Sequence, residues 1–246
     1  MPYIEEVQCT LCANNGADCE DCVHNYEDYE DLFYELSEEE IREREYQVFK
    51  EAKEALAGEK LIMPVPREFV QAFAAAQKFS TQELRSHAKY WDVFCGEDYL
   101  MATDGHALAK IQTAVPEALR GKHLVDCTED GVTMSKQPSA VFGGEAQGIL
   151  NEVRNDSYPA ERVLTKEELK DCFCKYESPD GSEFLQIQDG PVIQEILLDR
   201  VMAALEDGET VSLRYHPRLA YKQLGIEGKS IECFIMPVLT DEEKIG

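Results

Sequence analysis

Four cysteines near the N-terminus have the spacing of a metal site. Cys9 and Cys12 form one C-x-x-C pair, and Cys19 and Cys22 form a second pair after six intervening residues. A two-residue spacer lets both sulfurs of a pair bind one ion, and two pairs supply the four thiolates of a tetrahedral zinc site. Because all four positions would be filled by protein, the sequence predicts a structural zinc ion. So short a segment would take most of its folding free energy from the metal.

Two alternatives stay open for these four cysteines. An iron–sulfur cluster also takes four thiolates, and cysteines without metal would lie in an unstructured segment. His24 lies two residues past Cys22 and could replace one ligand. We expect the remaining cysteines to be buried as small hydrophobic side chains; they are Cys95, Cys127, Cys172, Cys174 and Cys233.

Residues that could catalyse a reaction are not grouped in this sequence. It contains no G-x-S-x-G elbow, no P-loop, no H-E-x-x-H motif and no dinucleotide-binding fingerprint. Asp104 and His106 lie close together, but no nucleophile or third metal ligand accompanies them. We therefore expect a protein that acts by binding and is not an enzyme.

Composition and charge narrow the class of protein further. The chain has 246 residues, 43% of them hydrophobic, which is enough to bury a core. No run approaches the ~18 apolar residues of a membrane span, and the N-terminus does not resemble a signal peptide. We expect a cytoplasmic protein with no membrane contact.

The net charge of the chain is −25, of which residues 1–60 carry −13 and the other 186 residues −12. This excess of negative charge does not exclude DNA binding through a local basic face.

Apolar spacing predicts the elements around these residues. A zinc-binding module over residues 1–30 is followed by an acidic helical segment over residues 31–60, which begins with the capping box Ser37-Glu-Glu-Glu40 and ends at Gly58. Its apolar stripe could dock on the rest of the chain or on another protein. A strand is predicted at Leu61-Ile-Met-Pro-Val65. Pro66 then begins a helix, whose apolar stripe is Phe69, Val70, Phe73 and Ala76.

The next segments predict the fold class. Residues 90–95 and 99–102 are predicted strands joined by a turn at Gly96-Glu-Asp98. The order strand, helix, strand, strand is typical of an α+β fold with helices on one face of an antiparallel sheet. Later, residues 196–205 have helical spacing, and a strand is predicted over residues 210–215.

One of these segments resembles a known family. Tyr99-Leu-Met-Ala-Thr-Asp-Gly-His-Ala-Leu-Ala109 is similar to the signature of the middle domain of bacterial DNA polymerase III beta subunits, the DNA sliding clamps. Further segments resemble the same family in the family's own order: residues 66–80 with residues 90–95, Tyr158-Pro-Ala-Glu-Arg-Val-Leu164, residues 211–219 and residues 232–239. The resemblance implies a DNA clamp-like fold over residues 61–246, as one expanded unit or as two shortened units divided near residue 164.

The chain also departs from the family pattern. Family members carry three related domains, and here the zinc-binding module and acidic helix stand in place of the first. Ala107 stands where the family usually has arginine, His216 where it has asparagine and Leu219 where it has tyrosine. Residues 112–155 match poorly. The chain thus resembles a shortened, phage-like clamp, for which ring closure and oligomeric state are open.

The resemblance implies two binding sites. Sliding clamps encircle double-stranded DNA, and their inner helices contact phosphates without reading sequence. The corresponding basic residues here are Arg67, Lys78, Lys166, Lys170 and Arg200. The family also has a pocket for short apolar peptides of DNA polymerase and other replication proteins. It lies between the Thr-Asp-Gly-His strand and the final Met-Pro strand. Carried over, this pocket comprises Thr103, Gly105, His106, Leu108, Pro217, Met236, Pro237 and Val238.

Two functions follow from these sites. The first is a sliding-clamp-like processivity factor of DNA replication, which would form a homo-oligomer to close a ring. The alternative is a non-ring, clamp-like adaptor or inhibitor that binds replication proteins. A ring requires a closed oligomer, whereas an adaptor can be monomeric.

Overall fold

The structure is a computed structural model that describes residues 50, 54–80, 90–143, 160–178, 181–188, 190–217 and 222–238. The chain divides into two compact units, Met1–Ala52 and Lys53–Gly246. The predicted zinc-binding module and most of the predicted acidic helical segment lie outside the described residues, so both stay predictions. The helices and strands described below belong to the second unit.

The described part of the first half of this unit, up to residue 143, contains helix α3 (Arg67–Gln77) and six strands, and residues 54–56 are also helical. The strands are β1 (Ala57–Ile62), β2 (Val93–Cys95), β3 (Tyr99–Thr103), β4 (Ala107–Gln112), β5 (His123–Thr128) and β6 (Gly131–Ser135). Helix α3 connects β1 to β2. Two 3-10 turns, η4 (Glu117–Leu119) and η5 (Ala140–Gly143), precede and follow the β5–β6 hairpin.

The described second half, from residue 160, adds two helices and seven strands. In chain order they are β7 (Ala160–Thr165), α5 (Lys166–Asp171), β8 (Phe173–Glu177), β9 (Glu183–Ile187), β10 (Val192–Ile193), α6 (Glu195–Ala204), β11 (Thr210–Tyr215), β12 (Leu224–Glu227) and β13 (Ile231–Ile235). Strands β10, β9 and β8 form a separate three-stranded sheet.

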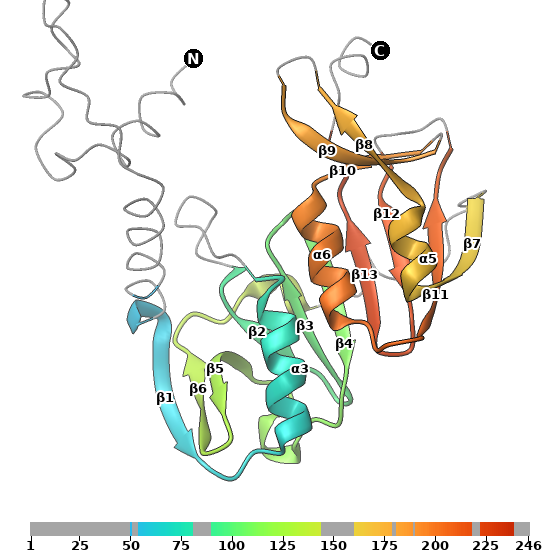
Figure 1. Cartoon of the computed structure of the whole chain (residues 1–246). Coiled ribbons are helices and arrows are strands. Elements are labelled where there is room, and N and C mark those ends of the chain that lie inside the picture. The colour runs from blue at the N-terminus through green and yellow to red at the C-terminus, as the bar shows by residue number, and fades with distance from the viewer. Residues whose placement is uncertain are drawn as a thin grey trace, which may run out of the picture. The chain divides into compact units, whose positions relative to one another are not determined.

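The other ten strands form one antiparallel sheet to which both halves contribute (Figure 1). Its order is β1-β6-β5-β2-β3-β4-β13-β12-β11-β7, so the two halves meet where β4 pairs with β13. In that pair Ala107 lies opposite Ile235, and Ile111 lies opposite Ile231. Residue 164 lies in β7, which pairs with β11 in this sheet. The predicted division of the chain near residue 164 stays a prediction.

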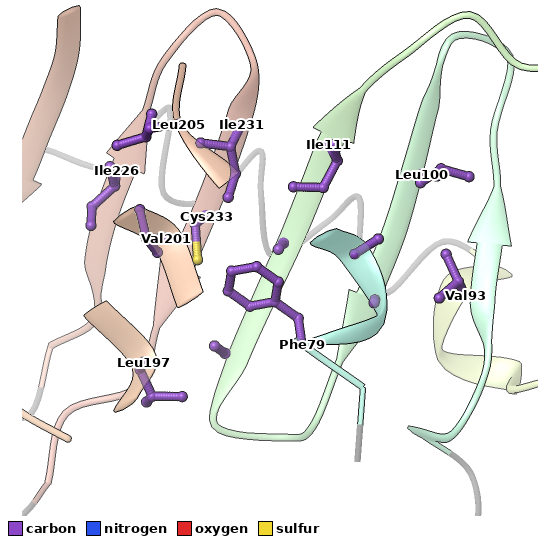
Figure 2. Close-up of a cluster of buried hydrophobic side chains, with 14 of the residues drawn as sticks. Phe79, Val93, Leu100, Ile111, Leu197, Val201, Leu205, Ile226, Ile231 and Cys233 are labelled. Carbon is purple, nitrogen blue, oxygen red and sulfur yellow. The ribbon is translucent and has the colours of Figure 1, made fainter. Parts of the chain in front are cut away.

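Helices α3 and α6 contact each other and pack on one face of this sheet (Figure 1). Helix α3 follows the predicted pattern, because Phe69, Phe73 and Ala76 recur at helical spacing and are buried. Figure 2 shows the core beneath the helices, with the Phe79 ring between side chains of the two halves. Cys233 and Val201 lie on one side of the ring, and Ile111 lies on the other. The two halves therefore share a single hydrophobic core.

A second, smaller apolar cluster lies on the opposite face of the sheet. Successive side chains of a strand point to opposite faces, so Leu108 faces away from the core that Ala107 and Ala109 join. Leu108 packs with Met101, Phe142 and Phe234. Turn η5 carries Phe142, whose ring stacks on that of Phe94 at 5.9 Å between centroids.

A buried carboxylate holds η5 on this face. Asp92 Oδ2 accepts a hydrogen bond from the Ser139 backbone N–H at 2.9 Å and lies 3.0 Å from His123 Nδ1. Only 2% of the Asp92 side chain is exposed. The carboxylate therefore joins the start of β2, the start of β5 and the segment before η5.

The structure confirms the predicted α+β class with an antiparallel sheet. The helices predicted after Pro66 and over residues 196–205 are α3 and α6, and the strand predicted over residues 210–215 is β11. Glu167 and Glu168 occupy the first turn of α5, where Thr165 and Glu168 form a capping box. Among the described helices none has the length and hydrophobicity needed to cross a membrane.

The helix predicted before Gly58 ends at Leu56, since residues 54–56 are helical and the next residue begins a strand. Gly58 lies inside strand β1, which begins at Ala57. A Cβ at residue 58 would come within 3.0 Å of the Met134 carbonyl oxygen on β6. Glycine thus allows the close approach of two strands here, at a register irregularity in their pairing. The prediction took the same residue as a helix stop.

Candidate functional site

The turn between β3 and β4 carries the Thr-Asp-Gly-His segment, and its own side chains hold it in place. Thr103 Oγ1 donates a hydrogen bond to the Ala107 carbonyl oxygen at 2.7 Å and accepts one from the Gly105 N–H at 3.0 Å. Asp104 Oδ1 accepts from the backbone N–H groups of His106 and Ala107, each at 2.8 Å. The turn is therefore closed by the side chains of Thr103 and Asp104.

Gly105 adopts a backbone conformation that favours glycine. Its φ angle is +89°, in the left-handed region where a Cβ meets its own backbone. A Cβ at this position would lie 3.5 Å from the Tyr90 ring, an ordinary contact, so the backbone angle and not the space restricts the residue. The turn leaves Gly105 and His106 exposed to solvent.

The C-terminal strand runs directly beside this turn. Strand β13 pairs with β4, and beyond Ile235 the pairing continues with a hydrogen bond from the Met236 N–H to the His106 carbonyl oxygen at 2.7 Å. Two residues later the Val238 N–H donates to the Val192 carbonyl oxygen on β10 at 2.8 Å. Residues 236–238 are thus attached to the Gly105–His106 turn at one end and to β10 at the other.

The predicted pocket residues fall into two groups. Thr103 and Leu108 are buried and lie opposite each other on β3 and β4, and Leu108 also lies opposite Phe234 on β13. These residues are the buried group. His106 and Met236 are exposed, and 40% of Met236 is accessible although the side chain is large and apolar. Pro237 and Val238 are half-buried.

Pro217 lies at the same end of the sheet but farther from the turn. It follows β11, whose Arg214 lies opposite Gly225 on β12. Gly225 in turn lies opposite Phe234 on β13. One strand, β12, therefore separates Pro217 from the Met236 segment. His216 Nδ1 donates a local hydrogen bond to the Pro217 carbonyl oxygen at 2.8 Å.

Arg200 lies beside the turn, a position that the sequence did not predict. Its Nη1 forms an ion pair with Asp104 Oδ2 at 2.5 Å, and the two side chains are 19% and 12% exposed. Arg200 belongs to α6, 96 residues from Asp104 in the chain. No local pattern links two residues so far apart.

The five predicted DNA contacts are distributed over three helices, α3, α5 and α6. Arg67 and Lys78 lie at the two ends of α3 and are exposed, as is Lys170 on α5. Lys166 donates to the Leu205 carbonyl oxygen at 2.8 Å and pairs with Asp207 at 3.0 Å. Lys166 and Arg200 are therefore engaged within the protein, whereas the other three point their charges toward solvent.

The predicted zinc ligands Cys9, Cys12, Cys19 and Cys22 lie outside the described residues. Within the part that the structure describes, no three His, Cys, Asp or Glu side chains are grouped as a metal site. The five remaining cysteines are free thiols: Cys95, Cys127 and Cys233 are buried as expected, Cys172 is half-buried, and Cys174 is exposed. Burial raises the pKa of the Cys95 thiol to about 12 and that of Cys127 to about 11. These thiols are therefore packing groups and not nucleophiles.

No protein-family model matches this chain. A search of curated proteins also finds no match. Similar solved structures include DNA polymerase III beta sliding clamps. The Caulobacter crescentus beta sliding clamp is 9% identical with a TM-score of 0.49, and the match covers 74% of this chain and 66% of that one. The Thermotoga maritima beta subunit is 12% identical with a TM-score of 0.44, and the match covers 74% of this chain and 66% of that one. The Helicobacter pylori beta clamp bound to a DNA ligase peptide is 13% identical with a TM-score of 0.43, and the match covers 73% of this chain and 65% of that one. The chain thus spans about two thirds of the length of these clamps.

Proposed function

We propose that this chain is a sliding-clamp-like replication factor that binds short apolar peptides of replication proteins beside the Gly105–His106 turn. The observation that carries the proposal is the pairing of β4 with β13. It brings the segment that resembles the clamp signature next to residues 236–238, more than a hundred residues later in the chain. The clamp resemblance assigns the family's peptide pocket to these same two segments.

The exposed surface of this junction suits a peptide with an apolar anchor. Met236 offers a flexible, polarisable side chain that adapts to different apolar partners. Next to it in the chain, Pro237 and Val238 are half-buried apolar residues, and Leu108 and Phe234 are buried on the two paired strands, β4 and β13. Because few residues carry most of the free energy of such a contact, Met236 is the side chain whose loss should weaken binding most.

A binding measurement with a labelled peptide tests the proposal. One solved beta clamp holds a DNA ligase peptide, and a fluorescent peptide of that kind is the probe. Fluorescence anisotropy should show saturable binding to the full chain. Met236→Glu places a charge in the apolar contact and should weaken binding by at least about tenfold, which corresponds to ~1.4 kcal/mol.

The matched control is Ile62→Glu. Ile62 is also a large exposed aliphatic residue, 83% accessible, but it lies on β1 at the far edge of the ten-stranded sheet. This variant should bind the peptide as the wild type does. Absence of binding by the wild type, or equal binding by Met236→Glu, contradicts the proposal.

The proposed DNA-binding surface is the face of the sheet that the helices cover. Arg67, Lys78 and Lys170 are the exposed members of the predicted set, and such residues bind phosphates without reading sequence. The double variant Arg67→Ala/Lys78→Ala should bind a DNA duplex more weakly, with a smaller dependence of affinity on salt. An unchanged affinity and salt dependence would remove these residues from the proposed DNA surface.

One observation favours the adaptor alternative. Lys166 and Arg200, two of the five predicted DNA contacts, form ion pairs within the protein. Fewer basic side chains are therefore directed to solvent than the processivity factor would use. A non-ring adaptor needs the peptide site but no DNA contact, so duplex binding separates the two functions. The predicted structural zinc ion at Cys9, Cys12, Cys19 and Cys22 is compatible with both.

A further inference from the structure

The Asp104 carboxylate connects the exposed turn to a buried helix. Its Oδ1 accepts the His106 and Ala107 N–H groups, and its Oδ2 pairs with Arg200 Nη1. Both charged groups are largely shielded from water, so their attraction is stronger than that of a surface pair. The conformation of the turn is therefore coupled to the position of Arg200.

Helix α6 holds Arg200 firmly. Leu197, Leu198 and Val201 of α6 are buried in the hydrophobic core that both halves share. One residue, Gln194, separates α6 from strand β10, which accepts the Val238 N–H through Val192. The segment from β10 to α6 thus contacts both sides of the candidate site.

A continuous series of contacts surrounds the candidate site and returns to the helix at which it begins. Arg200 binds Asp104, Asp104 fixes the turn, and the His106 carbonyl oxygen accepts the Met236 N–H. The Val238 N–H then returns to β10 and hence to α6. Three of these links, Arg200 to Asp104, Met236 to His106 and Val238 to Val192, join groups that are far apart in the chain, so loss of one of them loosens both sides of the site.

We infer that Arg200 is a positioning residue of the candidate site: through Asp104 it holds the Gly105–His106 turn against Met236. This role differs from the DNA contact that the sequence suggests for the same residue. The effect on peptide binding rests on the proposed function. The effect on the turn does not, because it follows from contacts within the chain.

Amide hydrogen exchange, measured by NMR without peptide, tests the effect on the turn. The amides to follow are those of Ala107 and Met236, which donate to Asp104 Oδ1 and to the His106 carbonyl oxygen. Arg200→Ala should speed exchange at both amides by about tenfold or more, since local opening then needs less free energy. Asp104→Asn keeps an oxygen that can accept the turn N–H groups but removes the ion pair, and should have the same effect.

Two further variants serve as rescue and control. Arg200→Lys keeps a cation within reach of Asp104 and should restore most of the protection. Arg120→Ala also breaks an ion pair, with Glu97, but at the opposite end of β3. It should leave both amides unchanged. Unchanged exchange in Arg200→Ala, or equally faster exchange across the whole sheet, would overturn the inference.

Peptide affinity is measured on the same variants with the probe described above. Arg200→Ala and Asp104→Asn should each bind about tenfold more weakly, and the double variant should be no weaker than either single one, because both remove one interaction. Equal affinity of Arg200→Ala and wild type overturns the role in binding. If exchange responds as expected but the wild type binds no peptide, the positioning role is supported and the proposed function fails.

Discussion

Asp104 uses one carboxylate oxygen for the His106 and Ala107 amides and the other for Arg200. Asp and Asn often close turns in this way, by accepting backbone N–H groups just beyond them. The Asp104-Gly105 pair is therefore typical of a turn. The sequence did not predict Arg200 as the partner of Asp104, because it lies 96 residues away on another element. Side-chain contacts between distant segments leave no periodic signal in a sequence.

Gly105 gives the first prediction at the residue scale. Gly105→Ala should lower the free energy of unfolding by about 1 kcal/mol or more, because alanine at a φ of +89° is strained. It should also weaken peptide binding, since the strain falls on the turn itself. Chemical denaturation and the anisotropy measurement check the two effects.

Gly121 provides the control for this substitution. It has a φ of +71°, and no heavy atom lies within 4 Å of the place that a Cβ would take, so Gly121→Ala suffers the same backbone strain at another turn. It should lose similar stability and keep its peptide affinity. A loss of affinity in both variants would show that the effect is general and not a property of the Gly105 turn.

At the scale of elements, the helices were easier to predict than the strands. Helices α3 and α6 show apolar side chains at the helical period over about three turns. Strands β8 and β12 are short, and β12 contains Gly225, so neither has a clear alternation of apolar and polar residues. The β5–β6 hairpin lies in the segment that matched the clamp family poorly. Pairing partners, and not local sequence, define these strands.

The attachment of η5 to the sheet gives a prediction at this scale. Asp92→Ala removes the acceptor for the Ser139 N–H and the partner of His123. Polar groups that stay buried without a partner cost about 1–3 kcal/mol each, so the variant should be less stable by about 2 kcal/mol or more. Thermal and chemical unfolding measure the change. Asp98→Ala, at an exposed aspartate in the β2–β3 turn, should change stability little; equal losses in the two variants would argue against this anchor.

At the scale of the whole molecule, the pairing of β4 with β13 makes one sheet from two halves. The sequence resemblance had suggested that these two segments are neighbours, because it assigned both to one pocket. It could not decide between one expanded unit and two shortened ones, since a shared sheet depends on contacts between segments distant in the chain. Nor does sequence alone reveal how many copies of the chain assemble.

Native mass spectrometry addresses the assembly and the predicted metal together. A processivity factor should give a closed oligomer, with one zinc ion per chain bound by Cys9, Cys12, Cys19 and Cys22. Cys9→Ser should lower the zinc content, and Cys174→Ser, at an exposed thiol of β8, should not. A monomer would favour the adaptor function. Zinc content that is unchanged in Cys9→Ser would contradict the four-thiolate site.

The most direct test of the central claim is an NMR titration of the labelled chain with the DNA ligase peptide. The proposed peptide site predicts that the largest shifts fall together on the amides of Gly105, His106, Met236 and Val238, with small changes at Ile62 on the distant strand β1. Shifts confined to other regions, or no shifts at saturating peptide, would contradict a binding site at the junction of β4 and β13.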